Sequence, residues 1–282
     1  MKSLVLFLLL LNSVTLAQES TIIIEKDVNA RVVKEWAESL DKISTINSTT
    51  YIVKKSGGED SLHKKGHRDA IVWMPNSTDL SKDTIVIFWF HGHWGYVPYR
   101  TFQDRTLKQF VPLSSKNFVL VIPEMPWSVH TPTPTKRNSQ LWKKTGDFLA
   151  FASQVNTIMS KHNKGNNLGA IDYRIVGHSA GGSTIKRLGI TGDLCKLSPS
   201  MIVWSDSSYG KWLDNAWDGC LKNHPSILVK VFVQKGGPPW RNATRFLGQF
   251  QDPPKNLELY IKSKGWSHKL IGNNIVKLSE VL

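Results

Sequence analysis

Short apolar, β-branched runs alternate with helix-like segments along most of the chain. The segments between the later runs show helical periodicity, clearest between residues 141 and 162, where apolar side chains recur every three to four positions. The runs that predict strands are Thr21–Glu25, Thr50–Lys54, Ala70–Trp73, Thr84–Phe90, Phe118–Pro123, Tyr173–Gly177, Met201–Ser205, Ile227–Val233 and Leu257–Ile261. The predicted helices are Tyr99–Phe110, Leu141–His162, Ala180–Leu188, Trp240–Phe250 and His268–Val281. Such alternation predicts an α/β fold, with a mostly parallel sheet covered by helices on both faces.

The pattern indicates one domain. We take the first three runs to be joined by short connections, and we expect them to form an antiparallel edge of the sheet. There is no internal repeat, no linker and no insertion large enough for a cap domain. We therefore expect a leader over residues 1–17 and a single domain over residues 18–282.

The amino-terminal segment has the features of a secretory signal. Lys2 precedes the apolar run Leu4–Leu11, and small residues occur around Ala17, where we expect cleavage. The alternative is an uncleaved anchor, but the apolar run is shorter than the roughly 20 residues that span a membrane. The sequence thus predicts a secreted or periplasmic protein without a membrane span.

Two cysteines are consistent with such a compartment. Cys195 and Cys220 are the only cysteines in the chain, and an oxidising environment permits a disulfide between them. We expect this bridge, the alternative being two buried free thiols.

Composition excludes disordered and fibrous proteins, since 40% of the residues are hydrophobic and 21% are charged. The formal net charge of +14 favours anionic partners such as cell-wall polymers, lipid head groups or nucleic acid. The alternative is an ordinary solvated surface. The chain carries no zinc-finger, RNA-recognition or basic-region signature, so we do not expect specific nucleic-acid binding.

The sharpest chemical motif is Gly177-His178-Ser179-Ala180-Gly181-Gly182, between a predicted strand and a predicted helix. A turn this tight strains its central residue, and glycines on either side make room for it. The serine oxygen would then stand above the sheet beside the helix amino terminus. The alternative is a glycine-rich turn with a capping serine.

Two further motifs follow predicted strands. The segment His91-Gly92-His93-Trp94-Gly95 could supply a backbone N–H to a developing oxyanion, with Ala180 supplying the other. Its alternative is a zinc site at His91 and His93. The segment Gly265-Trp266-Ser267-His268 follows the last strand, and His268 could take the serine proton. The alternative is an exposed histidine at a helix start.

These three motifs, in this order, resemble those of the α/β-hydrolase family over roughly residues 70–282. The resemblance implies a serine hydrolase with Ser179 as nucleophile, His268 as general base, and Ala180 and His93 as oxyanion donors. It implies neither a cofactor nor a metal.

The third residue of such a site is an acidic residue that orients the histidine, and its position here departs from the family pattern. The family usually places it after the penultimate strand, where this chain has Gln234-Lys235-Gly236-Gly237 and no carboxylate. Asp206, one strand earlier, is the preferred candidate, followed by Asp252 and Asp214. The alternative for Asp206 is an ordinary turn or cap aspartate.

Aromatic residues at strand ends predict a substrate mouth. The expected substrate-binding residues are Trp94, Tyr96, Trp127, His178, Tyr209 and Trp266, and the alternative for each tryptophan is core packing. Aromatic faces suit sugars, aromatic acyl groups or lipid chains. The sequence therefore predicts an esterase acting on a carbohydrate or cell-envelope ester, on a polymeric or anionic substrate. The alternatives are a peptidase or amidase with the same triad, and a non-catalytic binder of anionic polymers.

Overall fold

The computed structural model describes residues 21–24, 48–54, 69–93, 106–125, 141–263 and 265–282. Within these ranges, nine strands form one sheet in the order β1-β2-β3-β5-β4-β6-β7-β8-β9. They are β1 (Thr21–Ile24), β2 (Ser48–Lys54), β3 (Asp69–Pro75), β4 (Thr84–Phe90), β5 (Phe118–Pro123), β6 (Ile171–His178), β7 (Met201–Ser205), β8 (Leu228–Gln234) and β9 (Leu257–Lys262). Pairing is parallel from β5 through β4, β6, β7 and β8 to β9. The predicted mostly parallel sheet is therefore confirmed.

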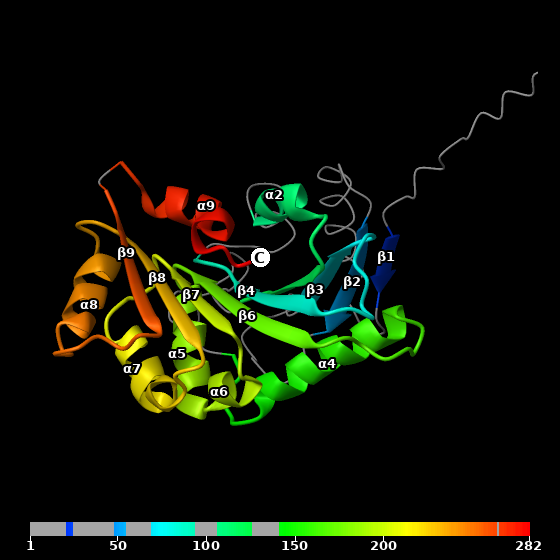
Figure 1. The fold of residues 1–282 in the computed structure, drawn as a ribbon, viewed down its shortest axis with the longest axis horizontal. Helices are drawn as coiled ribbons and strands as arrows, with labels where there is room; N and C mark the ends of the chain where they lie inside the picture. The colour runs from blue at the N-terminus through cyan, green and yellow to red at the C-terminus, as the bar shows by residue number, and fades with distance from the viewer. Residues whose placement is uncertain (1–20, 25–47, 55–68, 94–105, 126–140, 264) are drawn as a thin grey trace, which may run out of the picture.

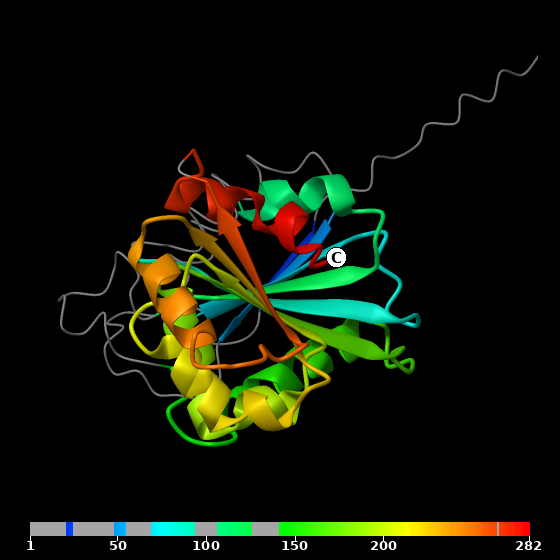
Figure 2. The ribbon, with the colours of Figure 1, turned by 60° about the vertical axis from the view of Figure 1, so that its left-hand side comes forward.

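Helices cover both faces of the sheet (Figures 1 and 2). One face carries α2 (Thr106–Phe110), continued by the 3-10 turn η2 (Val111–Leu113), and α9 (His268–Ser279). The other carries α4 (Asp147–His162), α5 (Gly181–Thr191), α6 (Asp193–Leu197), α7 (Trp212–Gly219), η3 (Leu221–Asn223) and α8 (Pro238–Leu247).

Burial on both faces explains why the central strands are apolar throughout. In β4, Val86, Phe88 and Phe90 point into one core, whereas Ile87 and Trp89 point into the other. Successive side chains of a strand face opposite sides, so a strand covered on both sides needs apolar residues at every position. The sheet consequently separates two apolar cores, one on the side of α9 and one on the side of α5.

Helix boundaries follow local backbone chemistry. Pro238 and Pro239 are the first two residues of α8, where a missing N–H costs no helical hydrogen bond. The helix predicted from Leu141 begins instead at Asp147, so its predicted start was wrong. Trp142 and Gly146 have φ of 50° and 93°, a left-handed backbone that interrupts an α-helix.

The edge formed by the first strands also differs from expectation. β2 and β3 are antiparallel as predicted, but β1 runs parallel to β2. A parallel pair requires a crossover of about a dozen residues or more. The segment between Ile24 and Ser48 is long enough to provide one. The expectation of short connections was therefore the source of the error.

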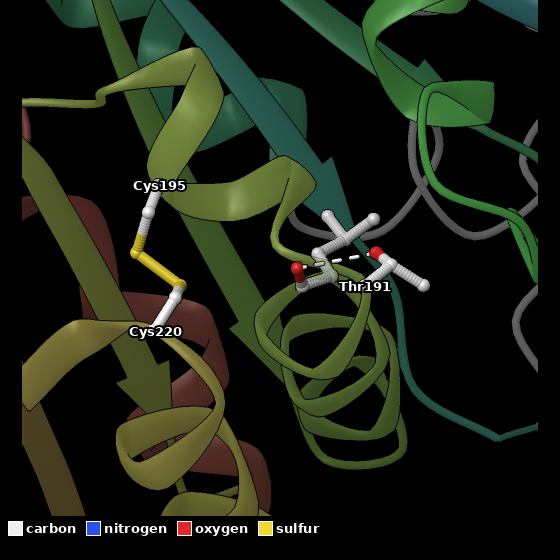
Figure 3. The surroundings of a disulfide bond; sticks show 4 residues. Thr191, Cys195 and Cys220 are labelled. Atoms are coloured by element: carbon white, nitrogen blue, oxygen red, sulfur yellow. Dashed lines mark hydrogen bonds between the residues drawn. A yellow bond between two sulfur atoms is a disulfide. The ribbon is translucent and has the colours of Figure 1, made fainter.

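A disulfide joins Cys195 in α6 to Cys220, the residue that follows α7 (Figure 3), as predicted. It lies beside a close contact between α5 and α7. A Cβ added to Gly189 would lie 2.6 Å from Ala216 Cα, and one added to Gly219 would lie 2.6 Å from the Gly189 oxygen. The bridge thus reinforces the packing of α5, the helix that follows Ser179.

The amino-terminal leader and a membrane span are two further points on which the sequence made predictions. The predicted leader, residues 1–17, lies outside the described residues. No helix in the described part of the chain is long and apolar enough to cross a membrane.

Replacing both cysteines by serine should lower the free energy of unfolding by about 3 kcal/mol, because the bond closes a loop with a sequence separation of 25. Urea unfolding of the oxidised protein and the double variant measures the difference. Thiol titration of the denatured, unreduced protein provides the control. Two reactive thiols there would contradict the bridge.

Candidate active site

The candidate residues meet at one edge of the sheet. Ser179 follows β6, Asp206 follows β7, and His268 begins α9 after β9. Because these strands are parallel, their carboxyl ends lie on the same side of the molecule. The register pairs His178 with Ser205, so the residues that follow them, Ser179 and Asp206, leave adjacent strands side by side.

Ser179 occupies a strained turn. Its φ is 54°, a left-handed conformation that non-glycine residues rarely adopt, and its N–H donates to the Ser205 oxygen over 3.1 Å. A Cβ on Gly177 would lie 2.7 Å from Ile185 Cδ1, and one on Gly181 would collide with the Phe90 carbonyl. The two glycines are therefore required by the close approach of strand and helix, as the motif predicts.

Asp206 and His268 are hydrogen-bonded. His268 Nδ1 lies 2.7 Å from Asp206 Oδ2, and the carboxylate is only 2% exposed. A carboxylate can only accept, so Nδ1 donates and Nε2 of the neutral ring remains an acceptor. The second carboxylate oxygen, Oδ1, accepts the N–H of Gln234 at 3.0 Å. This contact, expected from strand order, leaves His268 oriented by a buried charge.

The two other acid candidates lie elsewhere. Asp214 receives two hydrogen bonds of 2.8 Å from the Arg245 guanidinium. Burial raises the pKa of Asp214, but the hydrogen bonds and charge of Arg245, a backbone hydrogen bond and a hydrogen bond from Gln249 together lower that pKa overall. Asp252 is exposed, beyond the end of α8. The structure thus brings neither residue to His268.

The loop after β4 runs against the serine. A Cβ added to Gly92 would lie 2.9 Å from Ser179 Cβ and 3.4 Å from its Oγ. His93 follows at the surface, and Ala180 is buried immediately before the first turn of α5. Backbone N–H groups at a helix start have no intrahelical acceptor. The two predicted oxyanion donors therefore come from segments that flank the serine oxygen.

His91 has a bridging position that the sequence did not reveal. Its Nε2 accepts the N–H of Met125 at 3.0 Å, and its Nδ1 donates to the Gly92 oxygen at 2.9 Å. The ring thus ties the loop after β4 to the loop after β5. Among the described residues, no group of three or more histidine, cysteine or acidic side chains is arranged to hold a metal ion.

His178 packs under the predicted base. Its ring stacks on that of His268 with centroids 4.7 Å apart, and its Nδ1 donates to the Ser205 oxygen at 2.9 Å. Burial, followed by the nearby His268, lowers the pKa of His178 to about 4. His178 is therefore a neutral ring near pH 7.

The aromatic residues divide into two groups. Burial raises the pKa of Tyr209, the charge of Asp206 raises it further, and the nearby Ser179 side chain lowers it. Trp266 is half-buried, with Lys262 Nζ 5.4 Å from its ring centroid. Trp94, Tyr96 and Trp127 lie outside the described residues.

Comparison with solved structures identifies the architecture. A feruloyl esterase, FAE, superposes with a TM-score of 0.51 and 12% sequence identity over 87% of this chain and 91% of that one. A dipeptidyl aminopeptidase IV from Bacteroides ovatus gives 0.51 and 13% over 83% of this chain and 34% of that one. A dienelactone hydrolase from Anabaena variabilis gives 0.49 and 17%, over 83% and 93%. No protein-family model and no curated protein sequence matches the chain.

This chain has the α/β-hydrolase fold. The feature that distinguishes the site is where its carboxylate comes from, at the ends of β7 and β8. The carboxylate that contacts His268 follows β7, whereas β8 contributes to that carboxylate only a backbone group, the N–H of Gln234. A backbone donor has no side-chain signature, so the sequence could not reveal Gln234.

The low pKa of His178 predicts a pH-dependent stability. In the unfolded chain His178 takes up a proton near the ordinary histidine pKa of about 6.5. In the folded protein its pKa is about 4, so it takes up a proton only near that pH. The free energy of unfolding should therefore fall between about pH 7 and pH 4, by at most about 3 kcal/mol from this group. Urea unfolding across this range measures the slope, which should be shallower in His178→Gln. Parallel slopes would contradict the assignment.

Proposed function

We propose that this protein is a serine hydrolase that cleaves carboxylic esters, with Ser179 as nucleophile, His268 as general base and Asp206 as the acid. The observation that carries the proposal is the 2.7 Å hydrogen bond between His268 Nδ1 and the buried Asp206 carboxylate. It occurs at the same sheet edge as a serine held at positive φ. A strained serine and a carboxylate-oriented histidine are the parts that acyl transfer requires.

In the first half of the reaction, Ser179 Oγ bonds to the ester carbonyl carbon while His268 Nε2 takes the serine proton. Asp206 stabilises the resulting imidazolium and holds its orientation. The carbon–oxygen bond to the alcohol then breaks, and the alcohol leaves with the proton from His268. The product of this half is an acyl group on Ser179.

In the second half, a water molecule replaces the alcohol. The water oxygen attacks the acyl carbon while His268 takes a proton from the water. The bond between the acyl carbon and Ser179 Oγ then breaks, His268 returns the proton to Ser179, and the carboxylic acid product leaves. In both halves the carbonyl oxygen becomes negatively charged. The backbone N–H groups of Ala180 and of the segment at His93 are the proposed donors to it.

The proposed substrate is a carbohydrate or cell-envelope ester. Tyr209 and Trp266 offer aromatic faces of the kind that pack against sugars and aromatic acyl groups. The net charge of +14 favours a polymeric or anionic substrate. The fold shared with a feruloyl esterase is consistent with an aromatic acyl ester.

We also propose that the chain is exported, with cleavage of a signal peptide after Ala17. The Cys195–Cys220 disulfide supports this proposal, because such bonds persist in oxidising compartments.

A peptidase is the second candidate, since the fold is shared equally well with a dipeptidyl aminopeptidase. Assay of one purified preparation on acyl esters, acetylated and feruloylated glycans and peptide amides separates the two. Ester turnover far above amide turnover supports the proposal. Faster cleavage of peptides would replace it by the peptidase, and binding of an anionic glycan without turnover would replace it by a non-catalytic binder.

Replacing Ser179 by alanine should lower kcat by a factor of about 10⁴–10⁶, because the covalent route is lost. Ester hydrolysis measures the loss. A fluorophosphonate should label Ser179 of the parent protein and leave the variant unlabelled. A phosphonate found by mass spectrometry on another serine would reject Ser179 as the nucleophile.

Replacing Asp206 by asparagine should lower kcat by up to about 10⁴, because the amide favours the wrong tautomer of His268. The matched control is Asp252→Asn, an exposed carboxylate with no contact to His268, which should keep the parent rate. Circular dichroism verifies that both variants fold. A large loss confined to the Asp252 variant would transfer the role of the acid to that residue.

A further inference from the structure

The ring of His178 is held between the sheet and helix α9. On the side of the sheet, Nδ1 donates to the Ser205 oxygen at 2.9 Å and lies 3.1 Å from Ser205 Oγ. On the side of the helix, the ring stacks on His268 at an interplanar angle of 27°. A hydrogen bond to the backbone of β7 therefore fixes one side of a ring whose other side supports the proposed base.

Gly272 makes the second contact with this ring. A Cβ added to Gly272 would lie 2.5 Å from His178 Cε1, 2.7 Å from Nε2 and 2.8 Å from Nδ1. His268 and Gly272 are four residues apart, so they share one face of α9. Glycine destabilises a helix interior by about 1 kcal/mol relative to alanine. The space taken by the His178 ring explains why a glycine stands here.

Helix α9 is also tied to α2 at the level of Gly272. Gln109 Nε2 donates to the Gly272 oxygen at 3.0 Å, and Gln109 Oε1 accepts the N–H of Val276 at 3.1 Å. The helix is thus bonded to Gln109 and packed against His178 at the same turn. A side chain at Gly272 would push the His178 ring and α9 apart, and His268 is the first residue of that helix.

We propose that His178 is a positioning residue whose ring is the support on which α9 rests, setting where His268 stands relative to Ser179. This role replaces the substrate contact expected from the sequence, and it rests on the proposed function of Ser179 and His268.

The charge state of His178 fits this role. The groups that face it are His268, Asp206, His91 and Ser205, and its pKa is lowered to about 4 by burial and then by His268. During turnover His268 becomes an imidazolium. A neutral ring can remain stacked on that cation, whereas a second cation would repel it.

The test is a double-mutant cycle between Gly272→Ala and His178→Ala, with Gly265→Ala as control. Gly265 precedes the same helix, and a Cβ there would have no atom within 4 Å. In Gly272→Ala the new methyl group collides with the ring and displaces His268. We expect kcat to fall by about 10- to 100-fold with KM unchanged within about twofold, since a misplacement near 1 Å costs about this much.

The other variants give the complementary results. Gly265→Ala should retain the parent kcat. His178→Ala should lower kcat without raising KM. The double variant should be no slower than His178→Ala, because the ring with which the methyl group collides is gone.

Three results would overturn the proposal: equal kcat in Gly272→Ala and Gly265→Ala, multiplicative losses in the double variant, or a raised KM with normal kcat in His178→Ala. The last result would return His178 to a substrate contact. Circular dichroism of each variant verifies folding, and His178→Ala carries the KM test by itself if Gly272→Ala does not fold.

Amide hydrogen exchange of α9 separates this proposal from the proposed function. If the parent protein hydrolyses no ester and its Ser179 takes no fluorophosphonate, the proposed function has failed. The support of α9 by His178 still predicts faster exchange in α9 of His178→Ala than in that of Gly265→Ala. Equal exchange in these two variants would show that His178 does not hold the helix.

Discussion

Asp206 is only 2% exposed, and the cost of burying its carboxylate must be offset by hydrogen bonds. The site depends on those hydrogen bonds. The N–H of Asp206 donates to the Phe232 oxygen at 2.7 Å, and its two carboxylate oxygens accept from Gln234 and His268. Loss of either donor would leave a buried charge without a full set of partners. The ends of β7 and β8 and the start of α9 therefore hold one another in place.

The sheet makes this arrangement possible at small distances. β6, β7 and β8 are consecutive neighbours, and adjacent strands lie about 4.8 Å apart. Ser179, Asp206 and Gln234 leave those strands at the same edge, so the rigid sheet determines their spacing. Only His268 comes from a helix, and it needs contacts of its own. The stacked His178 ring and Gly272 provide them.

Patterns that depend on neighbouring residues could be predicted from the sequence. The strands β4, β5 and β7 have the predicted bounds, because each is a continuous apolar run buried on both faces. The strained turn at Ser179 follows from its flanking glycines, and the Asp206–His268 contact follows from strand order. The parallel direction of β1 could not be predicted, because pairing direction depends on how a distant segment crosses the sheet. The packing of His178 on Gly272 likewise joins residues far apart in the chain.

The two apolar cores anchor the two sides of the proposed site separately. Ile185 and Leu188 of α5 belong to the core on one face of the sheet, whereas Ile271 and Ile275 of α9 belong to the core on the other. The proposed nucleophile and its proposed base are thus anchored in cores on opposite faces of the sheet. A partial opening confined to the α9 side would remove His268 while the turn at Ser179 stays formed. Such an opening would separate the proposed base from the proposed nucleophile while most of the sheet remains intact.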